Sequence, residues 1–185
     1  MPTEGNAVVT WFGEHFAELH PLLQRLHREG GELIGEVELR YGQGLAGLLG
    51  RRLAARLGLP TGCRRCEMRV EIRHSESCLL WSRRFAGGQR MDSTFVPHGH
   101  FPAGHWLEST GKLSLELGVQ IIDGGWYWQQ RRMRFLGIPL PAWLQPRSEA
   151  YKCIEAGQYR FSVTFTLAGQ GLLFGYSGHL RPREA

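Results

Sequence analysis

Lysine is nearly absent from this 185-residue sequence, which contains only Lys112 and Lys152. Arginine therefore supplies almost all of the positive charge behind the formal net charge of +5 and the isoelectric point of about 9.3. The arginines are spread along the chain and alternate with acidic residues, as in residues 67–73. Because nucleic-acid-binding proteins usually gather their positive charge in a patch or stripe, we expect no nucleic-acid partner.

Long apolar runs are also missing. No window of about 18 uninterrupted apolar residues occurs, which argues against a membrane span. The first residues lack the basic segment and the apolar run of a secretory signal. The four cysteines are too few, at this chain length, to form a disulfide scaffold. We therefore expect a cytoplasmic protein with free thiols.

The common catalytic motifs are absent. The sequence contains neither the G-x-S-x-G of α/β-hydrolases nor the H-E-x-x-H of zinc proteases. Gly42, Gly44 and Gly47 match G-x-G-x-x-G by letter, but the alternating strands and helices of a dinucleotide-binding fold do not follow them. We predict no cofactor, and the sequence leaves open whether the protein is an enzyme.

Two small groups of possible metal ligands lack the rest of a recognisable site. Cys63 and Cys66 have C-x-x-C spacing, but no second pair accompanies them. His98, His100 and His105 lie in a Gly- and Pro-rich segment, and their spacing matches no established zinc motif. We therefore predict no metal site, although both groups carry ligand types that zinc prefers.

Two helices are predicted in the first third of the chain. Apolar residues three and four positions apart predict a helix over about residues 8–29, which Pro21 kinks or divides in two. A second helix is predicted over about residues 45–58, and Gly58 and Pro60 end it. Its leucines are predicted to form the buried face: Leu45, Leu48, Leu49, Leu53 and Leu57.

The rest of the chain is predicted to be almost entirely β. Residues 113–121 show the clearest alternation of apolar and polar side chains, and a strand over residues 32–41 precedes the main β region of about 66–181. About nine strands joined by short turns favour an antiparallel meander, which must curl or close to avoid open edges. We predict a single α+β domain over residues 1–185, mostly antiparallel β. Its curved meander closes to an up-and-down, lipocalin- or calycin-like barrel or half-barrel with the two N-terminal helices as plug or cover. The alternative is a helix-grip, START-like sheet.

Six short sequence patterns occur in order along the chain. They are Leu19-His20-Pro21-Leu22-Leu23-Gln24 with His27, Leu59-Pro60, Trp81-x-Arg83-x-Phe85, Glu108-x-x-Gly111, Ile138-Pro139-Leu140-Pro141 with Pro146, and Tyr176-x-Gly178-x-Leu180. In their order and spacing, the patterns resemble a bacterial family catalogued as a domain of unknown function, number 4166. That family has no assigned activity, and similar domains also occur appended to larger enzymes. The resemblance implies one domain over nearly the whole chain and supplies no functional residues.

Three predicted strands place charged side chains on the same face as large aromatic ones. Residues of one parity share a face of a strand, and the three sets are Trp81, Arg83 and Phe85; Trp106 and Glu108; and Trp126, Trp128, Gln130, Arg132 and Arg134. A charged side chain on a buried face is unfavourable unless a partner compensates it. We therefore predict that these faces line a pocket with polar groups among the aromatic ones.

We predict that this pocket binds a small apolar or amphipathic molecule. The predicted ligand-binding residues are Trp81, Arg83, Phe85, Trp106, Glu108, Trp126, Trp128 and Arg132. Arginine suits an anchoring role because its planar guanidinium binds carboxylates and phosphates through two hydrogen bonds. Three alternatives stay open: a structural ion pair inside the barrel, an enzyme that uses Glu108 as an acid or base, and a protein-interaction domain accompanying a larger enzyme.

Overall fold

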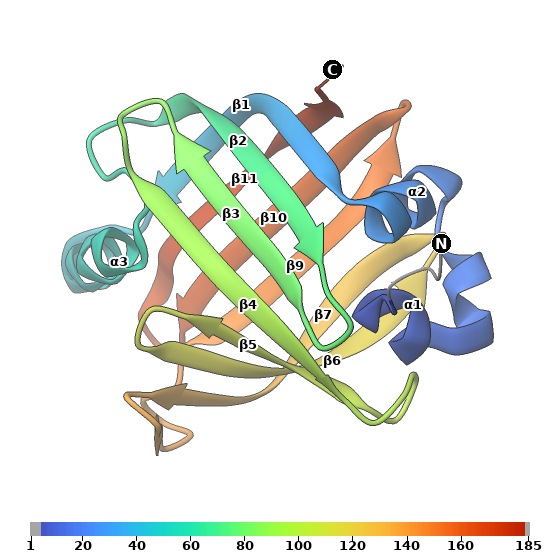
Figure 1. Cartoon of the computed structure of the whole chain (residues 1–185). Helices are drawn as coiled ribbons and strands as arrows, with labels where there is room; N and C mark the ends of the chain where they lie inside the picture. Colours follow the sequence, from blue (N-terminus) through green and yellow to red (C-terminus); the bar gives the residue numbers. More distant parts are fainter. Residues whose placement is uncertain (1–4, 184–185) are drawn as a thin grey trace.

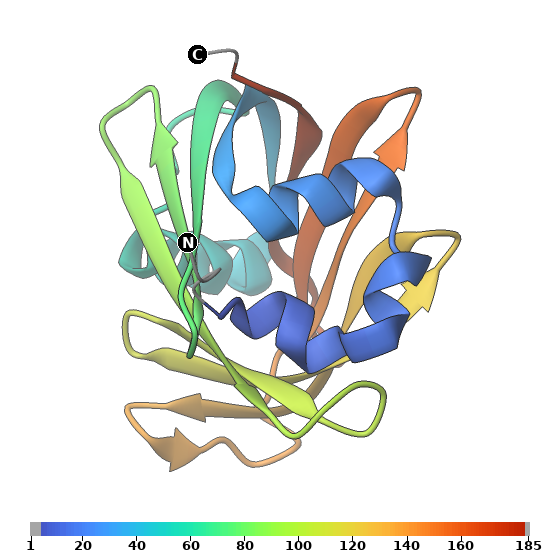
Figure 2. The same ribbon diagram turned by 45° about the vertical axis from the view of Figure 1, so that its right-hand side comes forward.

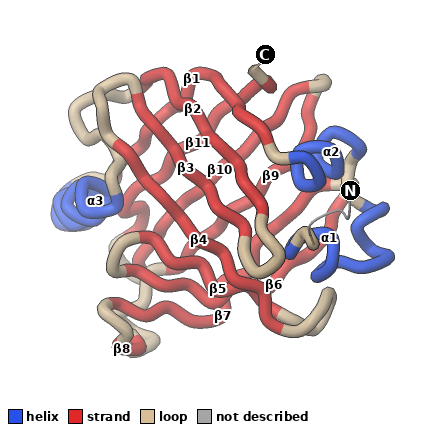
Figure 3. Tube along the Cα trace, viewed as in Figure 1, coloured by secondary structure: helices blue, strands red, loops and turns tan. Residues whose placement is uncertain are grey.

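Strands make up most of the computed structural model, which describes residues 5–183 (Figures 1 and 3). The strands are β1 (Gly31–Tyr41), β2 (Arg65–His74), β3 (Leu79–Phe85), β4 (Arg90–His98), β5 (His105–Thr110), β6 (Leu113–Ile122), β7 (Gly125–Phe135), β8 (Ile138–Pro139), β9 (Arg147–Glu155), β10 (Gln158–Leu167) and β11 (Gly171–Pro182). All of their pairings are antiparallel.

Strand pairing follows the order of the chain and closes a ring. Each strand from β1 to β7 pairs with the next, β7 pairs with β9, and the series continues through β10 to β11. β11 then pairs with β1, so ten strands form a closed up-and-down barrel without an open edge. The short β8 pairs only with the end of β7. The predicted barrel is confirmed, and the alternative helix-grip sheet is wrong because the strands close on themselves.

The helices lie at two sides of the barrel. The structure has α1 (Ala7–Phe12), the 3-10 helix η1 (Gly13–Glu18), α2 (Pro21–Glu29) and α3 (Gly44–Leu57). The segment predicted as a helix kinked or divided at Pro21 is divided, and Pro21 occupies the first turn of α2, where its missing N–H costs nothing. Figure 2 shows α1, η1 and α2 covering one side of the barrel, and Figure 1 shows α3 at the other. None of the helices in residues 5–183 is long and apolar enough to cross a lipid bilayer.

Helix α3 makes its closest contact with the barrel through its small residues. Its buried residues are Ala46, Gly47, Gly50 and Ala54, whereas Leu45, Leu48 and Leu49 are exposed. A Cβ atom at Gly50 would lie 1.9 Å from the carbonyl oxygen of Leu173 in β11, so only a glycine lets the helix approach so closely. The predicted leucine face is wrong for these three residues. Leu57 does point toward the barrel and contributes to its internal cavity.

Replacement of Gly50 by alanine is expected to destabilise the protein by about 1–3 kcal/mol, as overpacking does elsewhere. Helix propensity alone would favour alanine by about 1 kcal/mol, so a loss would show that contact with β11 dominates. Urea unfolding measures the difference. Gly62→Ala is the control, because no atom lies within 4 Å of a Cβ placed there. A Gly50→Ala protein as stable as the wild type would contradict the close packing.

A β-bulge in β7 changes which of its side chains face inward. Gln130 pairs with Leu117 and Arg132 pairs with Glu116, so Arg131 is an extra residue without a partner in β6. Before the bulge, Trp126 and Trp128 face the barrel interior, and after it Met133 does. Arg132 and Arg134 therefore lie on the exposed outer face. The prediction that they share the inner face with the tryptophans is wrong, because the bulge reverses the alternation.

Candidate functional site

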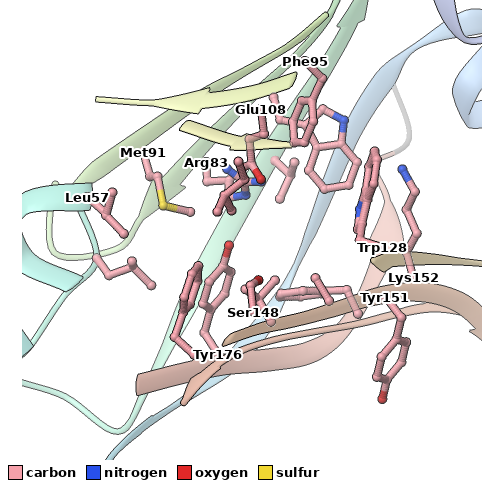
Figure 4. A pocket seen from close by; sticks show the side chains of 18 of the residues that line it. Leu57, Arg83, Met91, Phe95, Glu108, Trp128, Ser148, Tyr151, Lys152 and Tyr176 are labelled. Atoms are coloured by element: carbon pink, nitrogen blue, oxygen red, sulfur yellow. The ribbon is translucent and has the colours of Figure 1, made fainter. Parts of the chain in front are cut away.

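The barrel encloses a cavity of about 70 Å³. Aromatic and aliphatic side chains supply most of its wall, and Figure 4 shows how the polar and flexible residues are placed among them. The aromatic wall residues are Trp81, Phe95, Trp128, Tyr151, Tyr159, Phe161, Phe165, Phe174 and Tyr176. This volume is well below the roughly 300–1,000 Å³ of typical ligand pockets, so a ligand of the size of benzoate requires side chains of the wall to move. Leu57 and Met91 lie at one side of it, and a flexible methionine adapts its shape most easily.

Arg83 extends from β3 into this cavity and is 5% exposed. Its Nη1 donates a hydrogen bond to Oγ of Ser93 at 2.9 Å, its only hydrogen bond among the described residues. Ser93 Oγ lies 2.5 Å from Thr110 Oγ1, which donates to Oε1 of Glu108 at 3.3 Å. The guanidinium and the carboxyl group are thus linked through two hydroxyl groups.

No carboxylate lies within ion-pair distance of Arg83 in residues 5–183. Glu108 is directed into the same cavity (Figure 4), and burial raises the pKa of its carboxyl group, an effect that the nearby Arg83 charge opposes. A raised pKa weakens Glu108 as a counter-ion for Arg83. The cavity therefore holds a cation that the protein itself does not fully compensate.

Two tyrosines add hydroxyl groups to the wall near Arg83. Tyr159 of β10 and Tyr176 of β11 are buried, and burial raises the pKa of both phenols, so both stay protonated and able to donate a hydrogen bond. The Tyr159 hydroxyl has no hydrogen-bond partner among the described residues, nor does Nε1 of Trp81. Buried polar atoms without partners are rare in native proteins and call for a ligand or a water molecule.

Lys152 of β9 forms a second buried polar group. The residue is 1% exposed, and its Nζ lies 2.8 Å from Nε2 of His27 in α2. His27 Nδ1 in turn lies 3.4 Å from Nε2 of His74 in β2. Nζ also lies 3.6 Å from the centre of the Trp126 ring and 4.6 Å from that of Trp81. These side chains connect the cavity wall to the helices that cover the barrel.

Burial sets the protonation of this group. It lowers the pKa of Lys152 well below the ordinary value, and the charge of Arg83 lowers it further. Burial, Lys152 and His74 lower the pKa of His27 in the same way. The pKa of His74 falls to about 4, first through burial and then through Lys152. Each of these groups therefore favours its neutral form.

A protein-family model described as a domain of unknown function (DUF4166) matches residues 19–180 of the chain. The chain belongs to the DUF4166 family. A search of curated proteins gives no match. The matched range contains Arg83, Glu108 and Lys152, whereas α1 precedes it.

The structure of this DUF4166 domain places the eight predicted ligand-binding residues in three environments. Four of them line the cavity: Trp81, Arg83, Glu108 and Trp128. Phe85 is buried on the inner face of β3 outside the cavity wall. Trp106 and Trp126 are fully buried beneath α1, where the Trp126 ring lies 4.7 Å from that of Phe12. Arg132 lies on the outer face of the barrel, because the bulge at Arg131 reverses the alternation of β7.

Sequence reasoning missed Lys152 in the DUF4166 domain. The residue lies within the predicted β region of about residues 66–181, and the sequence patterns gave it no role. Parity in β9 places Lys152 on the same face as Ser148 and Ala150, which also line the cavity. Besides this parity, the rarity of lysine could have drawn attention to Lys152, because the chain contains only one other lysine.

The cysteine and histidine groups do not form a metal centre within the described chain. No cluster of three or more possible ligands is present in residues 5–183. Cys63 and Cys66 are free thiols, and the pKa of Cys66 is raised to about 11 by burial and by the neighbouring Cys63. A raised pKa disfavours the reactive thiolate. The His98 and His105 rings stack on each other with centres 5.0 Å apart.

Proposed function

We propose that the barrel binds a small molecule with a carboxylate or similar anionic end and an apolar or aromatic body. The observation that carries this proposal is the Arg83 guanidinium, which lies inside the cavity with one hydrogen bond and no ion-pair partner among residues 5–183. Burial of a charge is unfavourable unless an opposite charge or hydrogen bonds compensate it. An anionic ligand would supply both the opposite charge and the hydrogen bonds, because a guanidinium binds a carboxylate through two parallel N–H···O hydrogen bonds.

The surroundings of Arg83 support the same class of ligand. The hydroxyl groups of Tyr159 and Tyr176 offer further donors to an anion, and the walls formed by Trp81 and Trp128 suit an apolar body. The guanidinium carbon already lies 5.2 Å from the centre of the Trp81 ring. A ligand bound here would therefore place its charge at Arg83 and its apolar part against indole.

Tryptophan fluorescence is expected to distinguish carboxylates from neutral molecules of the same shape. Benzoate, phenylacetate and hexanoate should quench the emission saturably, whereas benzyl alcohol should bind at least about tenfold more weakly. Replacement of Arg83 by glutamine should weaken carboxylate binding by about 1.5–3 kcal/mol, the contribution of a hydrogen bond to a charged group. Native mass spectrometry of freshly purified protein would show whether a ligand accompanies it.

The matched control is Arg84→Gln, because Arg84 is the next residue of β3 and lies exposed on the outer face. This substitution removes the same charge outside the cavity and should leave carboxylate affinity unchanged. Equal affinity for benzoate and benzyl alcohol would refute the anionic anchor. Equal effects of the Arg83 and Arg84 substitutions would show that only net charge matters.

Acid–base catalysis by Glu108 is a second candidate function. Glu108 lines the cavity, and its Oε1 accepts a long hydrogen bond of 3.3 Å from Thr110. Its raised pKa brings the carboxyl group nearer to the range of useful general acids. Glu108→Gln keeps the shape of the side chain, so loss of turnover with retained ligand binding would favour this candidate.

A further inference from the structure

Lys152 has an environment that an ordinary structural lysine avoids. Its side chain lines the cavity, and its amine lies on the far side of the cavity from Leu57 (Figure 4). Lysine is almost never fully buried without a charged partner, yet the ion pairs of residues 5–183 do not include Lys152. Its hydrogen-bond partner is a histidine. The other lysine, Lys112, is exposed.

Burial and the charge of Arg83, which approaches from β3, oppose protonation of the Lys152 amine. His27 and His74 approach from α2 and β2, and burial favours their neutral forms too. The nearest apolar neighbours are the rings of Trp126, Trp81 and Trp128, whose centres lie 3.6, 4.6 and 5.6 Å from Nζ. Desolvation and a nearby cation are the two conditions that make a lysine amine nucleophilic at neutral pH.

We propose that Lys152 is a nucleophilic amine that forms an imine with a small aldehyde or ketone in the barrel. The proposal shares the cavity with the proposed function but does not need the anionic end of the ligand. Arg83 and Lys152 both contact Trp81, with the guanidinium carbon of Arg83 5.2 Å and Nζ of Lys152 4.6 Å from the centre of its ring. A carbonyl compound that also carries a carboxylate could therefore contact both.

The reaction balances without an oxidant or a metal. The lone pair of the neutral Nζ attacks the carbonyl carbon and forms a C–N bond, while the carbonyl oxygen takes a proton and becomes a hydroxyl. The nitrogen then loses its remaining proton as the hydroxyl leaves as water, and a C=N bond results. His27 is placed to accept a proton from Nζ and to return one to the departing oxygen, because the two nitrogens are 2.8 Å apart.

His74 gives this proton path an outlet. It lies 3.4 Å from His27 on the side away from Lys152, and it also lines a surface groove with Glu29 and Arg73. The three side chains therefore form a continuous line from the buried amine to the outer surface. Imine formation from the neutral amine releases water and no net proton, so the histidines serve to exchange the protons that move between nitrogen and oxygen during the reaction.

Reductive trapping with benzaldehyde tests the proposal. The full-length folded protein is incubated with benzaldehyde and cyanoborohydride at about pH 7, where an ordinary lysine is more than 99% protonated, and peptide mass mapping locates the added benzyl group. Apart from a benzyl group on the N-terminal amine, whose ordinary pKa of about 8 leaves it partly neutral at this pH, we expect one on Lys152, formed at least about tenfold faster than any on Lys112. In His27→Gln protein, labelling of Lys152 should slow by roughly 100-fold, the usual contribution of a general base.

Two variants and an unfolded control decide the outcome. Lys112→Met should keep the label, and Lys152→Met should lose it while retaining the circular dichroism of the wild type. In urea the two lysines should react alike, which shows that the reagent reaches both. Faster labelling of Lys112, or no labelling of Lys152 in the folded protein, would overturn the proposal. Carboxylate binding is measured separately by fluorescence, so failure of the imine leaves that result intact.

Discussion

Replacement of Lys152 by methionine is expected to make the protein more stable at about pH 7, by about 1–4 kcal/mol. Burial of the lysine in neutral form requires loss of its proton, at a cost of up to about 1.4 kcal/mol per pH unit below its ordinary pKa, and methionine has no such proton. Lys152 is buried among tryptophan rings without a carboxylate partner in residues 5–183. The substitution also removes the hydrogen bond to His27, and a buried acceptor left unpaired costs about 1–3 kcal/mol. This loss places the expected gain in the lower half of the range.

The pH dependence of stability separates this explanation from ordinary packing. Because the pKa of Lys152 is lower in the folded protein than in the unfolded chain, the unfolded chain binds more protons between the two pKa values. The free energy of unfolding of the wild type therefore rises with pH in that window, by up to about 1.4 kcal/mol per pH unit. The Lys152→Met protein lacks this contribution, so its advantage should shrink as the pH approaches about 10.

The histidines act in the same direction at lower pH. The pKa of His74 is lowered to about 4 in the folded protein, so stability should fall as the pH drops from about 6.5 toward that value. Urea unfolding of the wild type and of Lys152→Met between about pH 4 and pH 10 measures the contributions of His74 and of Lys152 to stability. Lys112→Met is the control, because Lys112 is exposed and its removal should not change the slope. A pH-independent difference between wild type and Lys152→Met would mean that Lys152 keeps its charge when folded.

The alternation of side chains was sufficient to predict the barrel. Residues 113–121 alternate without interruption, and in the structure Leu113, Leu115 and Leu117 of β6 all face the interior. The same signal gave the inward direction of Arg83 and Glu108, because no irregularity interrupts β3 or β5. Alternation of period two shows which side chains of a strand face the interior, so it predicts both the barrel and part of the cavity lining.

Sequence periodicity failed where local geometry depends on tertiary contacts. Trp126, Trp128, Gln130, Arg132 and Arg134 share one parity, and no residue among them marks Arg131 as the extra residue of a bulge. In α3 the leucine pattern wrongly placed Leu45, Leu48 and Leu49 on the buried face, because close approach to β11 requires glycine and alanine there.

Lys152 could not be interpreted as a site from its own strand. Its partners come from distant parts of the chain: His27 from α2, Trp81 from β3 and Trp126 from β7. Alternation in β9 gives the direction of the lysine but not what surrounds it. Closure of the barrel and the position of α2 create the desolvated environment, and neither follows from residues 147–155.

Replacement of Trp126 by alanine is expected to destabilise the protein by about 3–5 kcal/mol, as loss of a buried tryptophan does elsewhere. Trp126 is fully buried, and its ring lies 4.7 Å from that of Phe12 in α1 and 5.0 Å from that of His27 in α2. It therefore joins the covering helices to the barrel. The reduced side chain leaves a void that the ring of strands cannot collapse to fill.

The same substitution should change the chemistry of the neighbouring amine. The Trp126 ring lies 3.6 Å from Nζ of Lys152, and a void in its place admits water to the amine, so the pKa of Lys152 should rise toward its ordinary value. Labelling by benzaldehyde at about pH 7 should then fall at least about tenfold in protein that is still folded. Trp143→Ala is the control, because Trp143 is 77% exposed and its removal should change stability by no more than about 0.5 kcal/mol. Unchanged labelling of a folded Trp126→Ala protein would show that the indole does not keep the amine neutral.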